Sequence, residues 1–144
     1  MPPHITVLYP FVPADGLTPE VRSALATEAG DFEPFEVRFK RVERWPGVVY
    51  LAPMPATSFT ALTNAVAQRF PGHPPYEGEF DEVVPHLTVV EVGEDDDGVD
   101  LEAIALEVGR WLPFDVRVGR LEVIAEGHNG RWSTRWRIPL GVRP

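Results

Sequence analysis

Two short segments of the sequence place a histidine two residues before a threonine in nearly the same frame. Pro-His-Ile-Thr-Val begins at Pro3 and Pro-His-Leu-Thr-Val begins at Pro85, so four of the five residues are identical. On a β-strand, residues i and i+2 face the same side, and each motif therefore presents an imidazole and a hydroxyl on one face. The apolar residues between and after them face the other side, where a core can form.

These side chains are suited to acid and base catalysis at a phosphate. An unperturbed imidazole has a pKa of about 6.5, so one ring can accept a proton while a second, charged ring donates one. We therefore take His4 and His86 as the candidate catalytic pair. The hydroxyls of Thr6 and Thr88 can hold phosphate oxygens, whose charge rises during in-line attack. A lone histidine on a strand is more often structural, but two equivalent ones favour a shared site.

The hydrophobic pattern predicts the elements that must position these residues. Apolar side chains at helical spacing indicate helices, and alternating or β-branched runs bounded by proline and glycine indicate strands. Thr18 followed by Pro19 is a typical start for the first helix. Helices are expected at residues 18–29, 56–70 and 99–112, and strands at residues 4–9, 34–45, 47–53, 86–92, 113–126 and 131–140.

The elements occur twice in the chain. Residues 33–43 and 112–122 share six identities in eleven positions at a constant offset of 79. In both copies the apolar positions change parity near the middle, which predicts a bulge or bend in the strand. We expect one two-lobed domain over residues 1–144, with repeat copies at about 3–52 and 85–140 joined by a helix and loop at 56–84.

The duplicated pattern predicts an α+β fold with pseudo-twofold symmetry. Two antiparallel sheets would surround a central cleft, with the helices outside. The second copy has a strand and helix before its histidine, whereas His4 stands almost at the start of the chain. The first lobe is therefore expected to be short of its N-terminal strand and helix, or the true start lies upstream. An exposed sheet edge would result, and either a homodimer contact near the first lobe or weak order at the N-terminus is expected.

Composition excludes several classes of protein. The chain has 144 residues, 44% of them hydrophobic, which suffices for one core or two small ones. It has no cysteine, so disulfides, thiolate metal sites and thiol nucleophiles are excluded, in keeping with a cytoplasmic location. No apolar run is long enough to cross a membrane. The net charge of −9 disfavours extended nucleic-acid binding but leaves a small phosphorylated ligand or an RNA end possible.

The paired motifs resemble those of a known family. "HITV" and "HLTV", with the flanks "PPHITVLYPF", "PGVVYLAP" and "PPYEGEFDEVVPHLTV", resemble the two-histidine phosphoesterase superfamily, in particular its 2′-5′ RNA ligase-like branch, over essentially the whole chain. The resemblance implies metal-independent hydrolysis of 2′,3′-cyclic phosphates of nucleotides or RNA ends, as in RNA processing, and in some members 2′-5′ ligation. It assigns catalysis to His4 and His86, and phosphate binding to Thr6 and Thr88, with no cofactor.

Four further side chains are candidates for contacts to the substrate, although each also has a structural interpretation. Tyr9 and Phe11 follow the first motif and could stack on a base, but aromatic residues at strand ends more often belong to the core. Tyr76 lies in a proline-rich loop that could reach the cleft, and Arg135 could contact phosphate at its rim.

Two other functions remain open at this stage. A nucleotide or RNA-end binding protein could use the same cleft without turnover. A metal-dependent hydrolase could use both histidines as ligands, although neither motif supplies a carboxylate at ligand spacing. Ligand-induced stabilisation without product would indicate the first, and a metal-content assay would identify the second.

Overall fold

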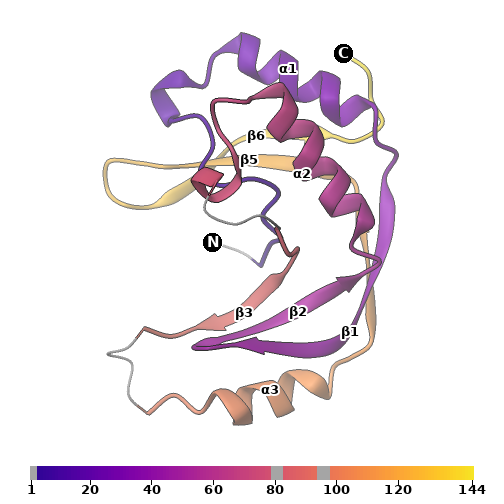
Figure 1. The fold of residues 1–144 in the computed structure, drawn as a ribbon, viewed down its shortest axis with the longest axis vertical. Helices are drawn as coiled ribbons and strands as arrows, with labels where there is room; N and C mark the ends of the chain where they lie inside the picture. Colours follow the sequence, from indigo (N-terminus) through magenta and orange to yellow (C-terminus); the bar gives the residue numbers. More distant parts are fainter. Residues whose placement is uncertain (1–2, 79–82, 94–97) are drawn as a thin grey trace.

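The protein is described by a computed structural model covering residues 3–78, 83–93 and 98–144. In these ranges three α-helices and six strands follow one another, with short 3₁₀ turns at Ala14–Gly16 and Pro75–Gly78 (Figure 1). Among these residues no helix is both long and apolar enough to span a membrane. The elements are α1 (Pro19–Gly30), β1 (Phe35–Trp45), β2 (Val48–Met54), α2 (Thr57–Arg69), β3 (Leu87–Glu91), α3 (Leu101–Gly109), β4 (Phe114–Val118), β5 (Arg120–Glu126) and β6 (Trp132–Pro139).

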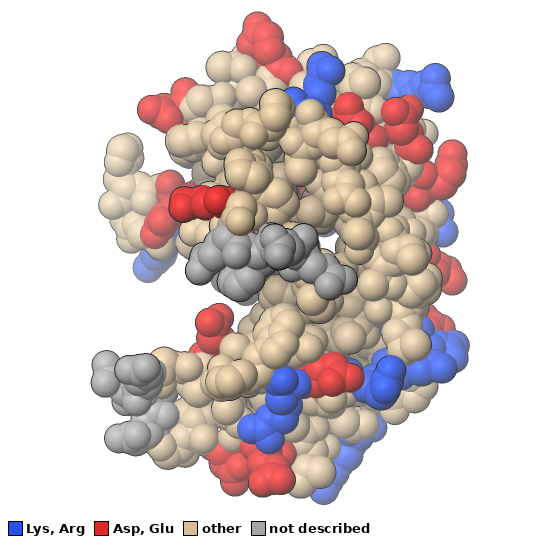
Figure 2. Space-filling view, viewed as in Figure 1, with Lys and Arg blue, Asp and Glu red and all other residues tan. Residues whose placement is uncertain are grey.

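The predicted α+β class with two antiparallel sheets is confirmed. One sheet has the strand order β3-β2-β1-β4, and the other pairs β5 with β6. Only Gly119 separates β4 from β5, so one length of chain passes from the first sheet to the second (Figure 1). The curved backbone leaves the molecule hollowed on one side, between β3 with α3 and the α1, β5 and β6 half (Figure 2).

The change of parity in the sequence marks a real irregularity in β1. The pairing of β1 with β2 shifts register between Phe39 and Val42, as a bulge requires. Phe39 lies on the buried face before the shift, and Val42 lies on the apolar face after it. In the second copy the corresponding place is the break at Gly119, 79 residues after Lys40. The extra residue lets each long strand bend while it keeps an apolar face.

Local signals explain where the helices and the tight hairpin lie. The Thr18 hydroxyl accepts a hydrogen bond from the Val21 amide at 3.3 Å and caps α1. Between β1 and β2, Gly47 has a φ of 73°, a conformation that favours glycine. A Cβ at this position would lie 2.9 Å from the Val92 carbonyl oxygen, because the end of β3 passes directly beside the turn.

Two apolar clusters hold the halves of the molecule together. The first lies between α1, α2 and β6, and the second lies on β1, β2 and the start of α2. Helix α2 contributes to both, which fixes the β1–β2 sheet relative to β6. The buried members of the first cluster are Leu25, Ala29, Leu62, Val66, Ile138 and Leu140, and those of the second are Val37, Phe39, Leu51 and Phe59.

An exposed ion pair joins β1 to β4. Arg38 and Asp115 lie opposite each other in the sheet, and the guanidinium donates to both carboxylate oxygens at 2.7 and 3.2 Å. The hydrogen bond and the charge of Arg38 hold the pKa of the Asp115 carboxyl below its usual range. Water surrounds both groups, so the pair fixes the strand register more than it stabilises the fold.

The strand expected from His4 to Tyr9 is wrong in its extent. Only Ile5 forms a β-bridge, and residues 7–10 are a series of bends. The bends occur because other partners satisfy the carbonyl groups: the Thr63 hydroxyl of α2 donates to the Val7 oxygen at 2.6 Å, and the Tyr76 amide donates to the Tyr9 oxygen at 2.6 Å. The segment therefore turns onto α2 instead of continuing along β3.

Candidate active site

One β-bridge brings the two histidine motifs side by side. Ile5 pairs with Leu87 in antiparallel orientation. In an antiparallel pair, one step in each direction from this bridge would set His4 opposite Thr88 and Thr6 opposite His86. Figure 1 shows the N-terminal segment beside the beginning of β3, at the centre of the curved molecule. The two motifs are thus adjacent in space although about eighty residues separate them in sequence.

The sheet separates an apolar face from a polar face at this place. Val42, Leu51, Leu87 and Ile5 pair in turn across β1, β2, β3 and the first motif, and all belong to the second apolar cluster. Val108 of α3 packs against the same cluster, so α3 covers this face (Figure 1). The residues of the motifs that could do chemistry lie on the opposite face, which α3 leaves uncovered.

The neighbouring row on the polar face carries an acid, a phenol and a hydroxyl. Glu43 pairs with Tyr50, and Tyr50 pairs with Thr88. Tyr50 is only 7% exposed. Burial, with a smaller contribution from the negative charge of Glu43, raises the pKa of the Tyr50 hydroxyl above its usual value. The phenol therefore remains protonated at neutral pH and can donate a hydrogen bond.

The His86 ring is held on two sides. Its Nδ1 lies 2.7 Å from the carbonyl oxygen of Val84, and a proton on Nδ1 would be donated to that oxygen. The rings of Trp45 and Tyr50 meet it nearly at right angles, with centroids 4.9 and 5.9 Å away. With Nδ1 engaged, Nε2 is the ring nitrogen left to exchange a proton with a ligand.

Trp45 and Tyr50 are site residues that the sequence reasoning missed. Their rings stack at 3.9 Å with an interplanar angle of 28°. The hairpin predicted around Pro46-Gly47 contained the signal, because pairing Trp45 with Val48 also pairs Glu43 with Tyr50 and sets both aromatic rings on one face. No local pattern indicated that His86 would lie beside these two rings.

The four secondary candidates lie in different environments. Tyr9 is exposed, and its ring lies 6.4 Å from that of Trp132 on β6. Phe11 meets Phe70 edge to face at 5.0 Å and packs against the first apolar cluster, which favours its structural role. Tyr76 and Arg135 are described in the next paragraph.

Tyr76 is half-buried with a φ of 50°, and burial raises the pKa of its hydroxyl. Arg135 is exposed at a register shift of β6, where Thr134 pairs with Ile124 and Trp136 pairs with Val123. The roles of Tyr76 and Arg135 in substrate binding stay predictions.

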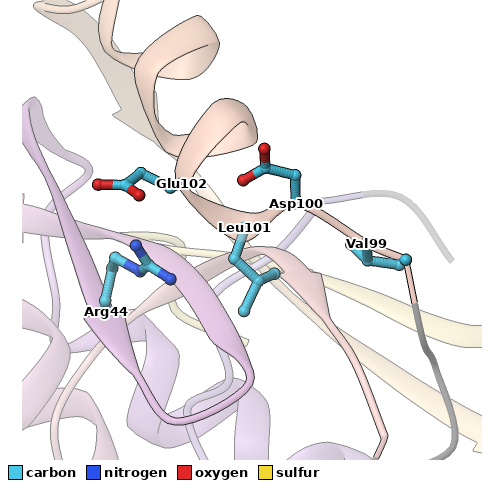
Figure 3. Close-up of a pocket in the computed structure, with 6 residues that line it drawn as sticks. Arg44, Val99, Asp100, Leu101 and Glu102 are labelled. Atoms are coloured by element: carbon cyan, nitrogen blue, oxygen red, sulfur yellow. The ribbon is translucent and has the colours of Figure 1, made fainter.

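A separate hollow of about 530 Å³ opens at the start of α3. It is lined by Arg44 of β1 and by residues 98–102, and Figure 3 shows the Arg44 side chain extending toward Glu102 and Asp100. Asp100 caps the helix by accepting from the Ala103 amide at 3.0 Å. Arg44 alternates with Glu43 and Trp45 along β1, so this hollow lies on the α3 face and not beside the histidines. Within the described ranges no three His, Asp or Glu side chains gather as a metal site.

Comparison with known proteins agrees with this architecture. A Bacillus pumilus protein named "Putative phosphoesterase" is 29% identical over 146 residues, covering 98% of this chain and 81% of that protein. The crystal structure of E. coli LigT complexed with 3′-AMP superposes with a TM-score of 0.55 at 19% identity, over 96% of this chain and 76% of LigT. A crystal structure described as a phosphoesterase gives a TM-score of 0.55 at 18% identity, over 96% and 77% of the two chains.

The two solved structures share the fold with this chain. A family model described as the 2′-5′ RNA ligase superfamily matches residues 1–130, which include both histidine motifs. On that match, this chain belongs to the 2′-5′ RNA ligase superfamily.

Proposed function

We propose that this protein hydrolyses 2′,3′-cyclic phosphates of nucleotides or RNA ends without a metal ion. Membership of the 2′-5′ RNA ligase superfamily supports a phosphoesterase-type function. The single observation that supports the finer proposal is the bridge between Ile5 and Leu87, because strand alternation on either side of it would bring His4, Thr6, His86 and Thr88 to one face. Two proton-carrying rings and two hydroxyl donors around one position suit attack on a phosphate.

In the proposed reaction, one imidazole of the His4 and His86 pair takes a proton from water. The water oxygen forms a bond to phosphorus, and the bond from phosphorus to one ribose oxygen breaks. The other histidine, charged at the start, gives its proton to that departing oxygen. Thr6 and Thr88 donate hydrogen bonds to the non-bridging oxygens, whose negative charge grows in the transition state. The product is a ribose monophosphate with a free neighbouring hydroxyl.

The same groups can also catalyse ligation. If the 5′-hydroxyl of a second ribose replaces water, it forms a bond to phosphorus, the bond to the 3′-oxygen breaks, and a 2′-5′ linkage results through the same proton transfers. LigT has been crystallised with 3′-AMP and with ATP, so that protein accommodates small nucleotides. We infer a ligand of this size for the present chain, because its net charge of −9 repels a long polyanion.

Incubation of the purified protein with 2′,3′-cyclic AMP, followed by phosphorus NMR, tests the proposal. We expect the cyclic phosphate signal to be replaced by that of a monophosphate at the same rate with and without EDTA. Binding without any product would instead make the protein a nucleotide-binding module. Loss of turnover with EDTA, restored by added metal, would contradict the metal-independent mechanism.

A further inference from the structure

The indole of Trp45 is an exposed aromatic surface beside the candidate catalytic pair. It stacks on Tyr50 at 3.9 Å, so Tyr50 covers one of its faces. The residue is nevertheless 37% exposed. Its centroid lies 4.9 Å from that of His86. A flat ligand resting on Trp45 would therefore lie next to His86.

We propose that Trp45 is the platform on which the nucleobase of the substrate stacks. This inference rests on the proposed function and extends it, because it assigns recognition of the substrate's base to a particular side chain. Every nucleobase has a π-face, so stacking recognises the base class without reading its identity. A purine gains more than a pyrimidine, because its larger ring overlaps more of the indole.

The position of Trp45 suits this role because the ring is fixed before a ligand arrives. Trp45 is the last residue of β1 and is followed at once by the tight turn at Pro46-Gly47. Below it, Tyr50 is buried in the sheet. A side chain held in one orientation loses little conformational entropy on binding, so stacking adds more to affinity.

The spacing and the charge of the site agree with a base at this position. One ribose separates the base of a nucleotide from its cyclic phosphate, so the two ends of a single nucleotide can reach the neighbouring Trp45 and His86. Glu43 lies on the same face, paired with Tyr50. The negative charge of this carboxylate repels the phosphate of the substrate. A larger part of the binding free energy must therefore come from stacking of the base.

The test compares a nucleoside 2′,3′-cyclic phosphate with the base-free glycerol cyclic phosphate. Four proteins are assayed: the wild type, Trp45→Ala, Trp45→Phe and Trp111→Ala. Trp111 is a matched control, because it is 74% exposed and follows α3, on a different part of the chain. Thermal unfolding of each variant shows that it is folded.

We expect Trp45→Ala to lower kcat/KM for the nucleoside substrate by about 5- to 150-fold, mainly through KM, as loss of one stacked base predicts. Turnover of the base-free substrate should fall by a clearly smaller factor, because there Trp45→Ala removes only the contact of the indole with His86. Trp45→Phe should keep most of the wild-type value, and Trp111→Ala should match the wild type on both substrates. An equal loss on both substrates would overturn the proposal, because Trp45 would then act only by supporting His86.

Binding of 3′-AMP, measured by calorimetry, separates this inference from the proposed function. If no cyclic phosphate is hydrolysed but 3′-AMP binds, and Trp45→Ala raises its Kd, the stacking role of Trp45 is supported and the hydrolase proposal is wrong. If hydrolysis occurs but Trp45→Ala changes neither kcat/KM nor the Kd for 3′-AMP, the hydrolase proposal is supported and the stacking role is wrong.

Discussion

Ile5 and Leu87 form one antiparallel β-bridge, and this contact defines the candidate active site. Both side chains belong to the apolar cluster shared by β1, β2 and α2. Burial therefore fixes the register, since a slip of one residue would turn the apolar side chains outward. Continued by one residue in each direction, the same register would set His4 across from Thr88 and Thr6 across from His86. Packing on one face of the sheet would thus position the candidate catalytic residues on the other.

The two threonine hydroxyls should contribute to rate more than to stability. Thr6→Val or Thr88→Val removes a hydroxyl and keeps the shape of the side chain. We expect kcat for 2′,3′-cyclic AMP to fall by about 10²- to 10³-fold in each variant, as after loss of one donor to a developing anion. Thr60→Val is the control, because its hydroxyl donates to the Ala56 carbonyl within α2. Wild-type rates in both motif variants would show that the hydroxyls do not hold the phosphate.

Ionisation of Tyr50 should depend on the charge of Glu43. Burial is the larger cause of the raised pKa and the Glu43 carboxylate the smaller, so Glu43→Gln should lower the pKa of Tyr50 without returning it to the usual value. The phenolate absorbance during an alkaline titration measures the change, and Tyr50→Phe identifies the signal. An unchanged titration curve in Glu43→Gln would show that the two side chains do not interact.

The raised pKa of Tyr50 also predicts a dependence of stability on pH. The folded state favours the neutral phenol, so this stabilising contribution is complete below the unfolded pKa of about 10 and is lost as pH rises through the folded pKa. The difference in melting temperature between wild type and Tyr50→Phe should therefore shift against the wild type in alkaline buffer. A difference that is constant from neutral to strongly alkaline pH would contradict the assignment.

The first apolar cluster should carry a large part of the stability. Leu62 is 1% exposed within α2, whereas Leu106 is 68% exposed on α3. We expect Leu62→Ala to reduce the free energy of unfolding by about 2–5 kcal/mol, because the substitution leaves a cavity. Leu106→Ala should cost less than about 0.5 kcal/mol. Urea denaturation measures both, and equal losses would show that α2 does not anchor the core as described.

Much of the fold was predictable because it depends on local patterns. The start of α1 at Pro19 followed from Thr18 and the proline after it, and the bulge in β1 followed from the parity change between Phe39 and Val42. The first motif was harder, because Thr63 of α2 and the amide of Tyr76 bind its carbonyls from distant parts of the sequence. Long-range partners of this kind leave no periodic signal.

The candidate site was predictable only in part, for a related reason. The repeat pointed to His4 and His86, because duplication makes equivalent residues visible in the sequence. The repeat contains no signal for Trp45, because the contact of its ring with that of His86 joins β1 to the start of β3 across β2. The homodimer expected at the sheet edge of the first lobe stays a prediction.

The most direct test of the central claim is the rate of 2′,3′-cyclic AMP hydrolysis by His4→Ala and His86→Ala, followed in EDTA across a range of pH. Each substitution should lower kcat/KM by about 10²- to 10⁴-fold and remove one limb of a bell-shaped pH profile, because each deletes one proton-transfer group. The exposed His128, in the turn between β5 and β6, is the control, and His128→Ala should leave the profile unchanged. Wild-type turnover in either His4→Ala or His86→Ala would contradict catalysis by the pair.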